Sequence, residues 1–397
     1  MKLSRKPKIG YQEIIIVALG VAAMVFFRLA DKSLARLSPV FEYHADAAVS
    51  ADIPAHEPEP PHHIATPSAV RAIYMSSWVA GTKDWRAKLV SFIDESEVNA
   101  VVIDVKDYSG KISFDTDDPI IDEMGAEEIR IRDAKEFIAE LHTHGIYVIG
   151  RISSFQDPVF VAYRPEFAIK RKNGSIWKDR KGIAWVDPYS RAAWDYLVRV
   201  GKAAERVGFD ELNYDYVRYP TDGDMNNIVY PLSDGTKSKS DVIGEYFAYL
   251  DKELADTPTP ISVDLFGLTT TRMDDMNIGQ ILEKAAPHVD FIAPMVYPSH
   301  YPDGYDGYQN PAKYPYEIIL QAMKKAADRL VAASSSPDKL RPWLQDFDLG
   351  ATYDAPMIKK QKQAVYDAGL GSWMMWDPKN LYTRDGYEKA PPSTAAN

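Results

Sequence analysis

The sequence predicts a (β/α)8 barrel, the TIM barrel, and three observations support this fold class. Eight short apolar runs typical of strands occur between residues 70 and 390. Stretches with the apolar spacing of amphipathic helices lie between them, which is the pattern of βα units around a parallel sheet. The segment SSWVAG after the first run is not the glycine-rich phosphate turn of an open doubly wound sheet. That open sheet is the alternative, and a closed barrel is favoured.

The predicted strands and helices alternate along this region. The strands are 72–78, 100–105, 147–153, 211–217, 261–266, 291–297, 341–347 and 372–376. The main helices are 85–97, 134–144, 190–207, 241–255, 315–333 and 355–368. Three connections, 107–132, 154–189 and 221–240, are longer than a simple βα loop. Because all three follow the C-terminal end of a strand, we expect them to shape a cleft where barrel enzymes hold their active sites.

Two segments precede the predicted barrel, which we place at residues 70–390. Residues 1–44 contain a basic flank and then an uncharged apolar run from Ile14 to Phe27, the pattern of a signal peptide or a membrane anchor. The run is shorter than the about 20 residues of a comfortable membrane span, but no small-residue cleavage site follows it directly. We therefore expect an uncleaved transmembrane anchor, with the barrel in the periplasm or outside the cell. Cleavage would instead make the protein secreted.

Residues 45–69 are rich in Pro, Ala and acidic residues and contain few large apolar ones. This composition predicts a flexible linker that its prolines partly extend. His62 and His63 lie in this segment, and we expect both to be solvated.

Composition excludes several classes of function. The net charge of −11 argues against nucleic acid as a partner. The absence of cysteine excludes thiol nucleophiles, disulfides and cysteine zinc sites, and with few histidines we expect neither a metal nor another cofactor. Eight Trp and 24 Tyr suit core packing, and they also suit stacking on sugar rings.

Charged and aromatic side chains gather at the predicted strand ends. They are Trp78, Asp104, Lys106, Arg151, Asp215, Arg218, Asp264, Tyr297, Gln345, Asp346 and Trp376. Each alone has a structural explanation, such as an ion pair or a turn, but a barrel brings all its strand ends to one mouth. Carboxylates held together raise one another's pKa, which suits an acid/base pair. Together with aromatic platforms they indicate glycoside hydrolysis, in which one carboxyl group protonates the leaving oxygen and another is nucleophile or base.

The most informative acid lies in GFDELNYDYVRYP, residues 208–220. Strand alternation places Asn213, Asp215 and Val217 on one face and Tyr216 and Arg218 on the other. A carboxylate within a strand needs a function or a partner, because burying an unpaired charge is costly. A structural ion pair with a nearby arginine is the alternative explanation for Asp215.

Several phrases of the sequence resemble a known bacterial family, the α-amylase-like barrels named "putative glycosyl hydrolase domain". They are RAIYMSSW, VVIDVKD, GIYVIGRI, RKGIAWVDPYSR, GFDELNYDYVRYP, VDLFG, APMVYPSHY, RPWLQDF and WMMWDP. They occur in order over nearly the whole of residues 70–382. The resemblance implies a TIM barrel and an activity on glycosidic bonds.

A more distant resemblance connects GFDELNYDYV with the fourth-strand motif of chitinase-like barrels. Met295, Tyr297 and Trp376 are also similar to a Met-x-Tyr pair and a floor tryptophan of those barrels. However, Val217 stands where they have their proton-donating glutamate, and Asn213 replaces an aspartate. The departure argues against substrate-assisted chitinase chemistry.

Asp215 is the acid that remains. In amylase-like and α-galactosidase-like barrels an aspartate at the end of the fourth strand is the nucleophile, so the resemblance implies that role for Asp215. Asp264 on the next strand is the first choice for the partner acid, with Asp346 and Asp104 as alternatives.

The remaining strand-end residues are assigned to substrate binding. They are Asp104, Lys106, Arg151, Arg218, Tyr297, Gln345, Asp346, Trp78 and Trp376. We expect Arg151 and Arg218 to hold Asp215 ionised, Tyr297 and Gln345 to bond sugar hydroxyls, and the two tryptophans to stack on sugar rings.

The sequence therefore predicts a glycosidase with two catalytic aspartates that acts on an envelope or extracellular polysaccharide. One alternative is a barrel that binds carbohydrate without cleaving it. Another is a hydrolase or lyase of a different bond, whose acidic cluster holds Ca²⁺ or Mg²⁺. Carboxyl separations of about 5 to 5.5 Å would indicate retention of configuration and about 6.5 to 9.5 Å inversion; both outcomes stay open at this stage.

Overall fold

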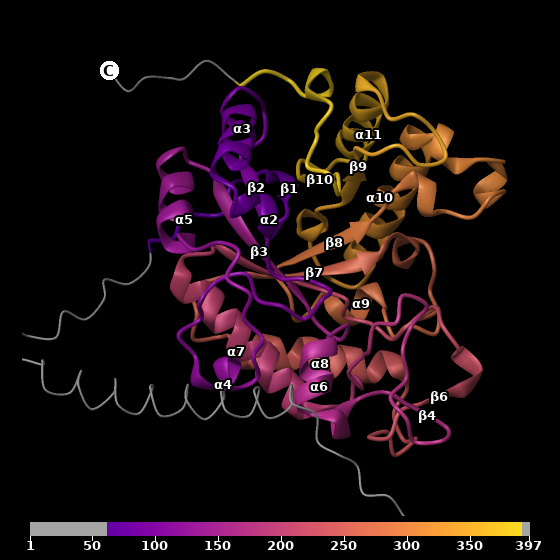
Figure 1. Ribbon diagram of the computed structural model, residues 1–397. Coiled ribbons are helices and arrows are strands. Elements are labelled where there is room, and N and C mark those ends of the chain that lie inside the picture. The colour runs from indigo at the N-terminus through magenta and orange to yellow at the C-terminus, as the bar shows by residue number, and fades with distance from the viewer. Residues whose placement is uncertain (1–61, 391–397) are drawn as a thin grey trace, which may run out of the picture. The chain divides into compact units, whose positions relative to one another are not determined.

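The structure is a computed structural model that describes residues 62–390. Its centre is a closed barrel of eight parallel strands, which confirms the predicted fold class (Figure 1). In chain order the strands are β1 (Arg71–Met75), β2 (Ala100–Lys106), β3 (Tyr147–Ser153), β5 (Glu211–Asp215), β7 (Ile261–Phe266), β8 (Phe291–Met295), β9 (Trp343–Gln345) and β10 (Trp373–Trp376). Each strand pairs with the next along the chain, and β10 pairs with β1 to close the barrel.

Six longer helices lie where the periodicity predicts them. They are α3 (Lys83–Asp94), α5 (Ala134–Thr143), α7 (Arg191–Val207), α8 (Lys239–Glu253), α10 (Pro315–Ala332) and α11 (Ala355–Asp367). Each carries apolar side chains on its buried face, which is why the 3.6-residue spacing identifies it.

Four short helices and a small hairpin-like pair occupy the loops, and the sequence does not predict them. They are α2 (Ser77–Ala80), α4 (Pro119–Glu123), α6 (Pro158–Tyr163), α9 (Leu282–Ala285), and the antiparallel pair β4 (Lys170–Arg171) with β6 (Ile228–Val229). These helices are too short to show a period. Capping was the available signal for α4 and α6, because Asp118 and Asp157 each cap a helix whose first turn begins with Pro.

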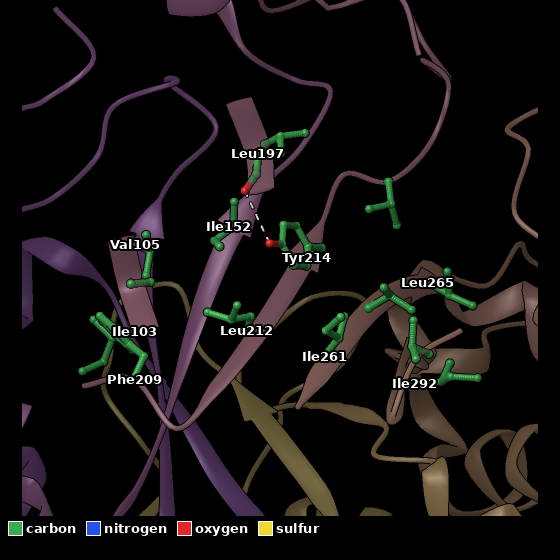
Figure 2. Packing of buried hydrophobic residues seen from close by; sticks show 14 of the residues in the cluster. Ile103, Val105, Ile152, Leu197, Phe209, Leu212, Tyr214, Ile261, Leu265 and Ile292 are labelled. Carbon is green, nitrogen blue, oxygen red and sulfur yellow. Dashed lines mark hydrogen bonds between the residues drawn. The ribbon is translucent and has the colours of Figure 1, made fainter. Parts of the chain in front are cut away.

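Outward-facing strand residues form the main core between the barrel and its helices (Figure 2). On β5, Leu212 and Tyr214 face α7, and the Tyr214 hydroxyl donates to the Leu197 carbonyl at 3.4 Å. Gly201 permits this approach, because a Cβ at that position would lie 2.4 Å from the Tyr214 hydroxyl oxygen. The contact fixes the strand that carries Asp215 at its end.

Inward-facing residues fill the barrel itself. The apolar ones are Ala72, Tyr74, Ala100, Val102, Tyr147, Ile149, Ala293, Tyr297, Trp343 and Met374. Near the N-terminal ends of the strands, Glu211 and Arg341 form a buried ion pair at 2.5 Å, and the Tyr147 hydroxyl donates to Glu211 at 3.0 Å. This pair lies at the start of β5, so it closes the barrel at the end opposite to Asp215.

Residues 62–69 pack against the barrel. The Ile64 backbone N–H donates to the buried Asp210 carboxylate at 2.9 Å, and His63 lies 3.4 Å from Glu205 and 3.6 Å from Asp210. The expectation of a solvated spacer is therefore right for the exposed His62 and wrong for His63. The physical reason is that the buried Asp210 carboxylate requires partners, and this segment supplies them.

The predicted anchor, residues 1–44, and the linker before residue 62 lie outside the described residues. In the part from 62 to 390, no helix combines the length and the apolar character that crossing a bilayer requires.

Candidate active site

A cavity of about 330 Å³ lies at the C-terminal ends of the barrel strands. The residues that shape its chemistry are Arg151, Asp215, Arg218, Asp264, Tyr297 and Trp376. This is the mouth at which the sequence places the site, and all six are among the predicted site residues. The structure thus brings together the two aspartates that the sequence proposes as catalytic.

Arg151 on β3 connects the acids of three strands. Its guanidinium donates to Asp104 at 2.7 Å and to Asp215, while its Nε lies 3.8 Å from Asp264 Oδ2. All four side chains are buried. Since one guanidinium contacts both Asp215 and Asp264, the two carboxyl groups face the same small volume.

Asp264 on β7 is the more deeply buried of the two proposed catalytic acids. Its Oδ1 accepts hydrogen bonds from Asn213 at 3.0 Å and from the Trp343 indole at 2.8 Å. Burial, followed by the negative charge of Asp215, raises the pKa of Asp264 to about 8. Asp264 is therefore a carboxylic acid that retains its proton at neutral pH.

Asp215 is the last residue of β5, and both of its oxygens have donors. Oδ2 accepts from Arg151, and Oδ1 accepts from the backbone N–H of Tyr216 at 2.6 Å. Tyr216 has a φ of 54°, a left-handed conformation that costs free energy in a residue with a side chain. The hydrogen bond and the left-handed residue together end the strand and fix the Asp215 carboxylate toward the cavity.

The turn at Tyr216 also corrects the predicted alternation beyond Asp215. Val217 is buried in the outer core rather than sharing a face with Asp215, while Tyr216 and Arg218 both line the cavity. Among residues 62–390, Arg151 alone forms a direct ion pair with Asp215. Arg218 attracts Asp215 from a greater distance, so its part in keeping Asp215 ionised stays a prediction.

Trp376 and Tyr297 form aromatic walls of the cavity. The Trp376 ring stacks on Tyr74 with centroids 3.9 Å apart and meets the edge of Trp343 at 5.5 Å. The Arg151 guanidinium lies 5.1 Å from the Trp376 ring centre. Trp376 therefore has a fixed orientation, as a stacking surface for a sugar ring requires.

Lys106 does not reach the cavity, although strand alternation places it on the same face as Asp104. The pairing register with β3 shifts between Asp104 and Lys106, and such a bulge turns the next side chain to the other face. Lys106 is fully buried, with its ammonium 2.9 Å from Asp157 and 2.6 Å from the Ser153 carbonyl. Its role is structural, and the prediction of substrate binding is wrong.

Gln345 and Asp346 are also absent from the cavity wall. Gln345 accepts from the Ser299 hydroxyl at 2.8 Å and donates to the Phe347 carbonyl at 2.8 Å, so both ends of its amide position loops. Asp346 faces away from the barrel axis and accepts from the Tyr387 hydroxyl at 2.8 Å, and burial raises its pKa to about 6.

Trp78 and Asp104 lie near the mouth without lining the cavity. Trp78 belongs to α2, is 61% exposed and lies over Arg130 at 4.5 Å. Asp104 is held behind Arg151 and accepts from the Tyr74 hydroxyl at 2.5 Å; burial raises its pKa. Asp104 thus supports Arg151 rather than facing a ligand.

Sequence reasoning missed two groups that shape the site. Trp343 supplies the indole N–H to Asp264, and Tyr74 supplies the hydroxyl to Asp104. Strand alternation could have placed both residues inside the barrel. Trp343 shares a face with Gln345, and Tyr74 is an inward-facing residue of β1. Within residues 62–390, no three His, Asp or Glu side chains are arranged as ligands of one metal ion.

Solved structures with the same fold include the glycoside hydrolase domain of PgaB (BpsB) from Bordetella bronchiseptica. It is 14% identical, with a TM-score of 0.55 over 81% of this chain and 99% of that one. The C-terminal domain of a putative chitinase from Desulfitobacterium hafniense is 12% identical, with a TM-score of 0.50 over 81% and 97%. At these identities the likeness shows the fold alone.

A hypothetical protein from Ruminiclostridium thermocellum is 32% identical, with a TM-score of 0.45 over 48% of this chain and 96% of that chain. No curated protein matches the sequence. The model of the family named "Putative glycosyl hydrolase domain" matches residues 72–382. That match spans the whole barrel from β1 to beyond β10, and the chain belongs to this glycosyl hydrolase-like family.

Proposed function

We propose that this protein is a glycoside hydrolase in which Asp264 is the general acid and Asp215 is the nucleophile. The observation that carries the proposal is the contrast between two aspartates in one cavity. Asp215 is in charge-assisted contact with Arg151, whereas the pKa of Asp264 is raised to about 8. Two carboxyl groups whose surroundings make one an acid and the other a carboxylate are what glycosidic cleavage requires.

The contacts of Asp264 support Oδ2 as the oxygen that delivers the proton. Oδ1 already accepts from Asn213 and Trp343, so the proton resides on Oδ2. Oδ2–H protonates the glycosidic oxygen as the bond to the anomeric carbon breaks, and the leaving alcohol departs with that proton. Arg151 is then positioned to stabilise the carboxylate left on Asp264, because its Nε lies 3.8 Å from the same oxygen.

Asp215 completes the reaction on the developing cationic sugar. As a nucleophile it forms a covalent bond to the anomeric carbon, which water later cleaves with Asp264 as the base. If Asp215 instead activates a water molecule, the same pair inverts the configuration. The anomer released first, followed by proton NMR, distinguishes the two courses.

We place the substrate outside the cytoplasm, as an envelope or extracellular polysaccharide. The apolar run from Ile14 to Phe27 after a basic flank supports export and attachment to a membrane. Aromatic walls at Trp376 and Tyr297 suit stacking on sugar rings.

Replacing either catalytic aspartate tests the proposal. We expect Asp215→Asn and Asp264→Asn each to lower hydrolysis by at least about a hundredfold, the usual range for loss of an acid, base or nucleophile. Sugar release from a panel of polysaccharides is the measurement, with circular dichroism to verify the fold.

Asp346→Asn is the matched control, since Asp346 follows strand β9 of the same barrel but does not line the cavity. It should retain hydrolysis close to that of the unmodified protein. Unchanged turnover in both proposed catalytic variants would disprove the assignment. Glycan binding with no product from the unmodified protein would instead indicate a carbohydrate-binding barrel.

A further inference from the structure

Arg218 is the exception among the buried arginines of residues 62–390. Four others are paired with carboxylates: Arg86 with Asp133, Arg151 with Asp104, Arg329 with Glu283 and Arg341 with Glu211, at 2.8, 2.7, 2.6 and 2.5 Å. Arg218 is 9% exposed and lines the cavity, yet no carboxylate of the described residues lies within 4.0 Å of its nitrogens. The carboxylates of Asp215, Asp222 and Asp179 attract it only from beyond that distance. A buried cation without a carboxylate in direct contact is costly, so its retention requires a reason.

Aromatic faces and one carbonyl hold the Arg218 guanidinium in place. Its centre lies 4.9 Å from the Trp185 ring and 4.8 Å from the Phe266 ring, and Nη1 donates to the Tyr219 carbonyl at 3.0 Å. Trp185 is itself fixed, because its indole N–H donates to Asp179 at 3.0 Å. The other edges of the guanidinium remain available to a ligand, already oriented by these contacts.

The backbone supports the same interpretation. The left-handed Tyr216 turns the chain after Asp215, so that Arg218 lines the same cavity as the two aspartates. Burial lowers the pKa of Arg218, as expected for a cation removed from water. Backbone strain at Tyr216 and desolvation of Arg218 thus occur two residues apart in one site, and such costs are typical of positions kept for binding.

We propose that Arg218 binds a negatively charged substituent of the sugar, so that the substrate is an acidic polysaccharide. The proposal rests on the glycosidase function and adds the substrate class. A guanidinium forms two parallel, charge-assisted hydrogen bonds with a carboxylate, sulfate or phosphate. A neutral sugar has no anionic group with which to form them. Arg218 is a binding residue beside the proposed catalytic pair and takes no part in proton transfer.

The test measures binding of monosaccharides, which contain no glycosidic bond, to the full chain. Titration calorimetry compares glucuronate with glucose, galacturonate with galactose and mannuronate with mannose. Galactose 6-sulfate and galactose 6-phosphate distinguish sulfate and phosphate from carboxylate. We expect at least one anionic sugar to bind tenfold or more tightly than its neutral counterpart, with a preference that weakens as salt is added.

Variants of Arg218 test whether this residue causes the preference for anionic sugars. Arg218→Gln should abolish it, and Arg218→Lys should reduce it, because an ammonium keeps the charge but loses the paired hydrogen bonds. Arg272→Gln is the matched control, since Arg272 is exposed and bonds Asp274; it should leave the preference unchanged. Thermal unfolding of each variant verifies that the fold is intact, and if Arg218→Gln does not fold, the preference of the unmodified protein decides.

Neutral and anionic sugars of equal affinity would overturn the inference, and so would a preference that survives in Arg218→Gln. The proposed function is judged separately, by hydrolysis of polysaccharides. Cleavage of neutral polymers with no charge preference would end this inference and leave the hydrolase intact. A preference for anionic sugars without cleavage of any polysaccharide would support this inference and contradict the hydrolase function.

Discussion

At the scale of single residues, the two proposed catalytic aspartates differ in what surrounds them rather than in their chemistry. Asp215 has Arg151 and a backbone N–H at its oxygens. Asp264 is buried and has two neutral donors at one oxygen. Different environments thus explain how two identical side chains could take the proposed roles of acid and nucleophile.

The pKa of Asp264 predicts the pH dependence of hydrolysis. The general acid must carry its proton, so kcat/KM should be retained below pH 8 and fall as pH rises through about 8, where Asp264 ionises. Initial rates across pH 5 to 10 measure this limb. A fall in kcat/KM near pH 6 instead would identify a different acid. The Asp346→Asn variant should show the same fall near pH 8 as the unmodified protein.

The same pKa makes folding stability depend on pH. Asp264 has a pKa of about 8 in the folded chain against a reference of 3.8, so the folded state binds the proton more tightly. The free energy of unfolding contributed by this group is therefore full below about pH 4 and is lost as pH rises to about 8.

Asp264→Asn cannot ionise and should not show this loss. The Tm of the variant relative to the unmodified protein should therefore increase between pH 5 and pH 8, as measured by scanning calorimetry. A difference in Tm that does not change with pH would show that Asp264 titrates normally in the folded protein.

At the scale of elements, the contact between α7 and β5 positions the strand that ends at Asp215. Gly201→Ala would place a methyl group 2.4 Å from the buried Tyr214 hydroxyl. We expect a loss of about 1–3 kcal/mol of stability, the usual cost of overpacking a core. Urea unfolding measures it, and hydrolysis should fall as well if β5 shifts.

Gly244 on α8 offers a matched control within the same fold. A Cβ there would meet only Lys284, at 3.5 Å, which is an ordinary contact. Gly244→Ala should therefore be neutral or stabilise the protein by up to about 1 kcal/mol through helix propensity. Equal effects of the two substitutions would mean that the close approach of α7 is not what Gly201 provides.

At the scale of the whole molecule, the segment before β1 is part of the folded unit. The Thr66 hydroxyl lies 3.1 Å from that of Tyr147 in the barrel interior, and Ile64 and His63 contact Asp210. A chain that begins at Val70 leaves the buried Asp210 with fewer partners. It should lose about 1–3 kcal/mol of stability relative to a chain that begins at His62.

The stability lost when the chain begins at Val70 should vary with pH. The Asp210 carboxylate, 3.6 Å from the His63 ring, is the main cause that raises the pKa of His63. The stabilisation from this pair is therefore full below about pH 6.5, the reference pKa of histidine, and is lost as pH rises through the higher folded value. The difference in Tm between the two chains should be larger at pH 5.5 than at pH 8.5; an equal difference would exclude His63 as the cause.

Local patterns predicted most of the architecture. The eight strands and six longer helices lie within a few residues of their predicted ranges, because apolar periodicity is set by which face an element buries. Asp215, Asp264 and Arg151 were also predicted to lie at the mouth, because each is in the C-terminal half of a parallel strand, and the C-terminal ends of the strands converge in any barrel. The short helices lacked enough residues to show a period.

The pattern of apolar and polar residues was enough to predict the barrel, its open end and the strands that bring acids to it. Which side chains enter the cavity depends on contacts made in the folded chain: a bulge turns Lys106 away, and a left-handed Tyr216 turns Arg218 inward. Faces alternate with every residue of a strand, so one irregular residue exchanges inside for outside. That irregularity arises from contacts between distant segments, and the local pattern of apolar and polar residues does not contain it.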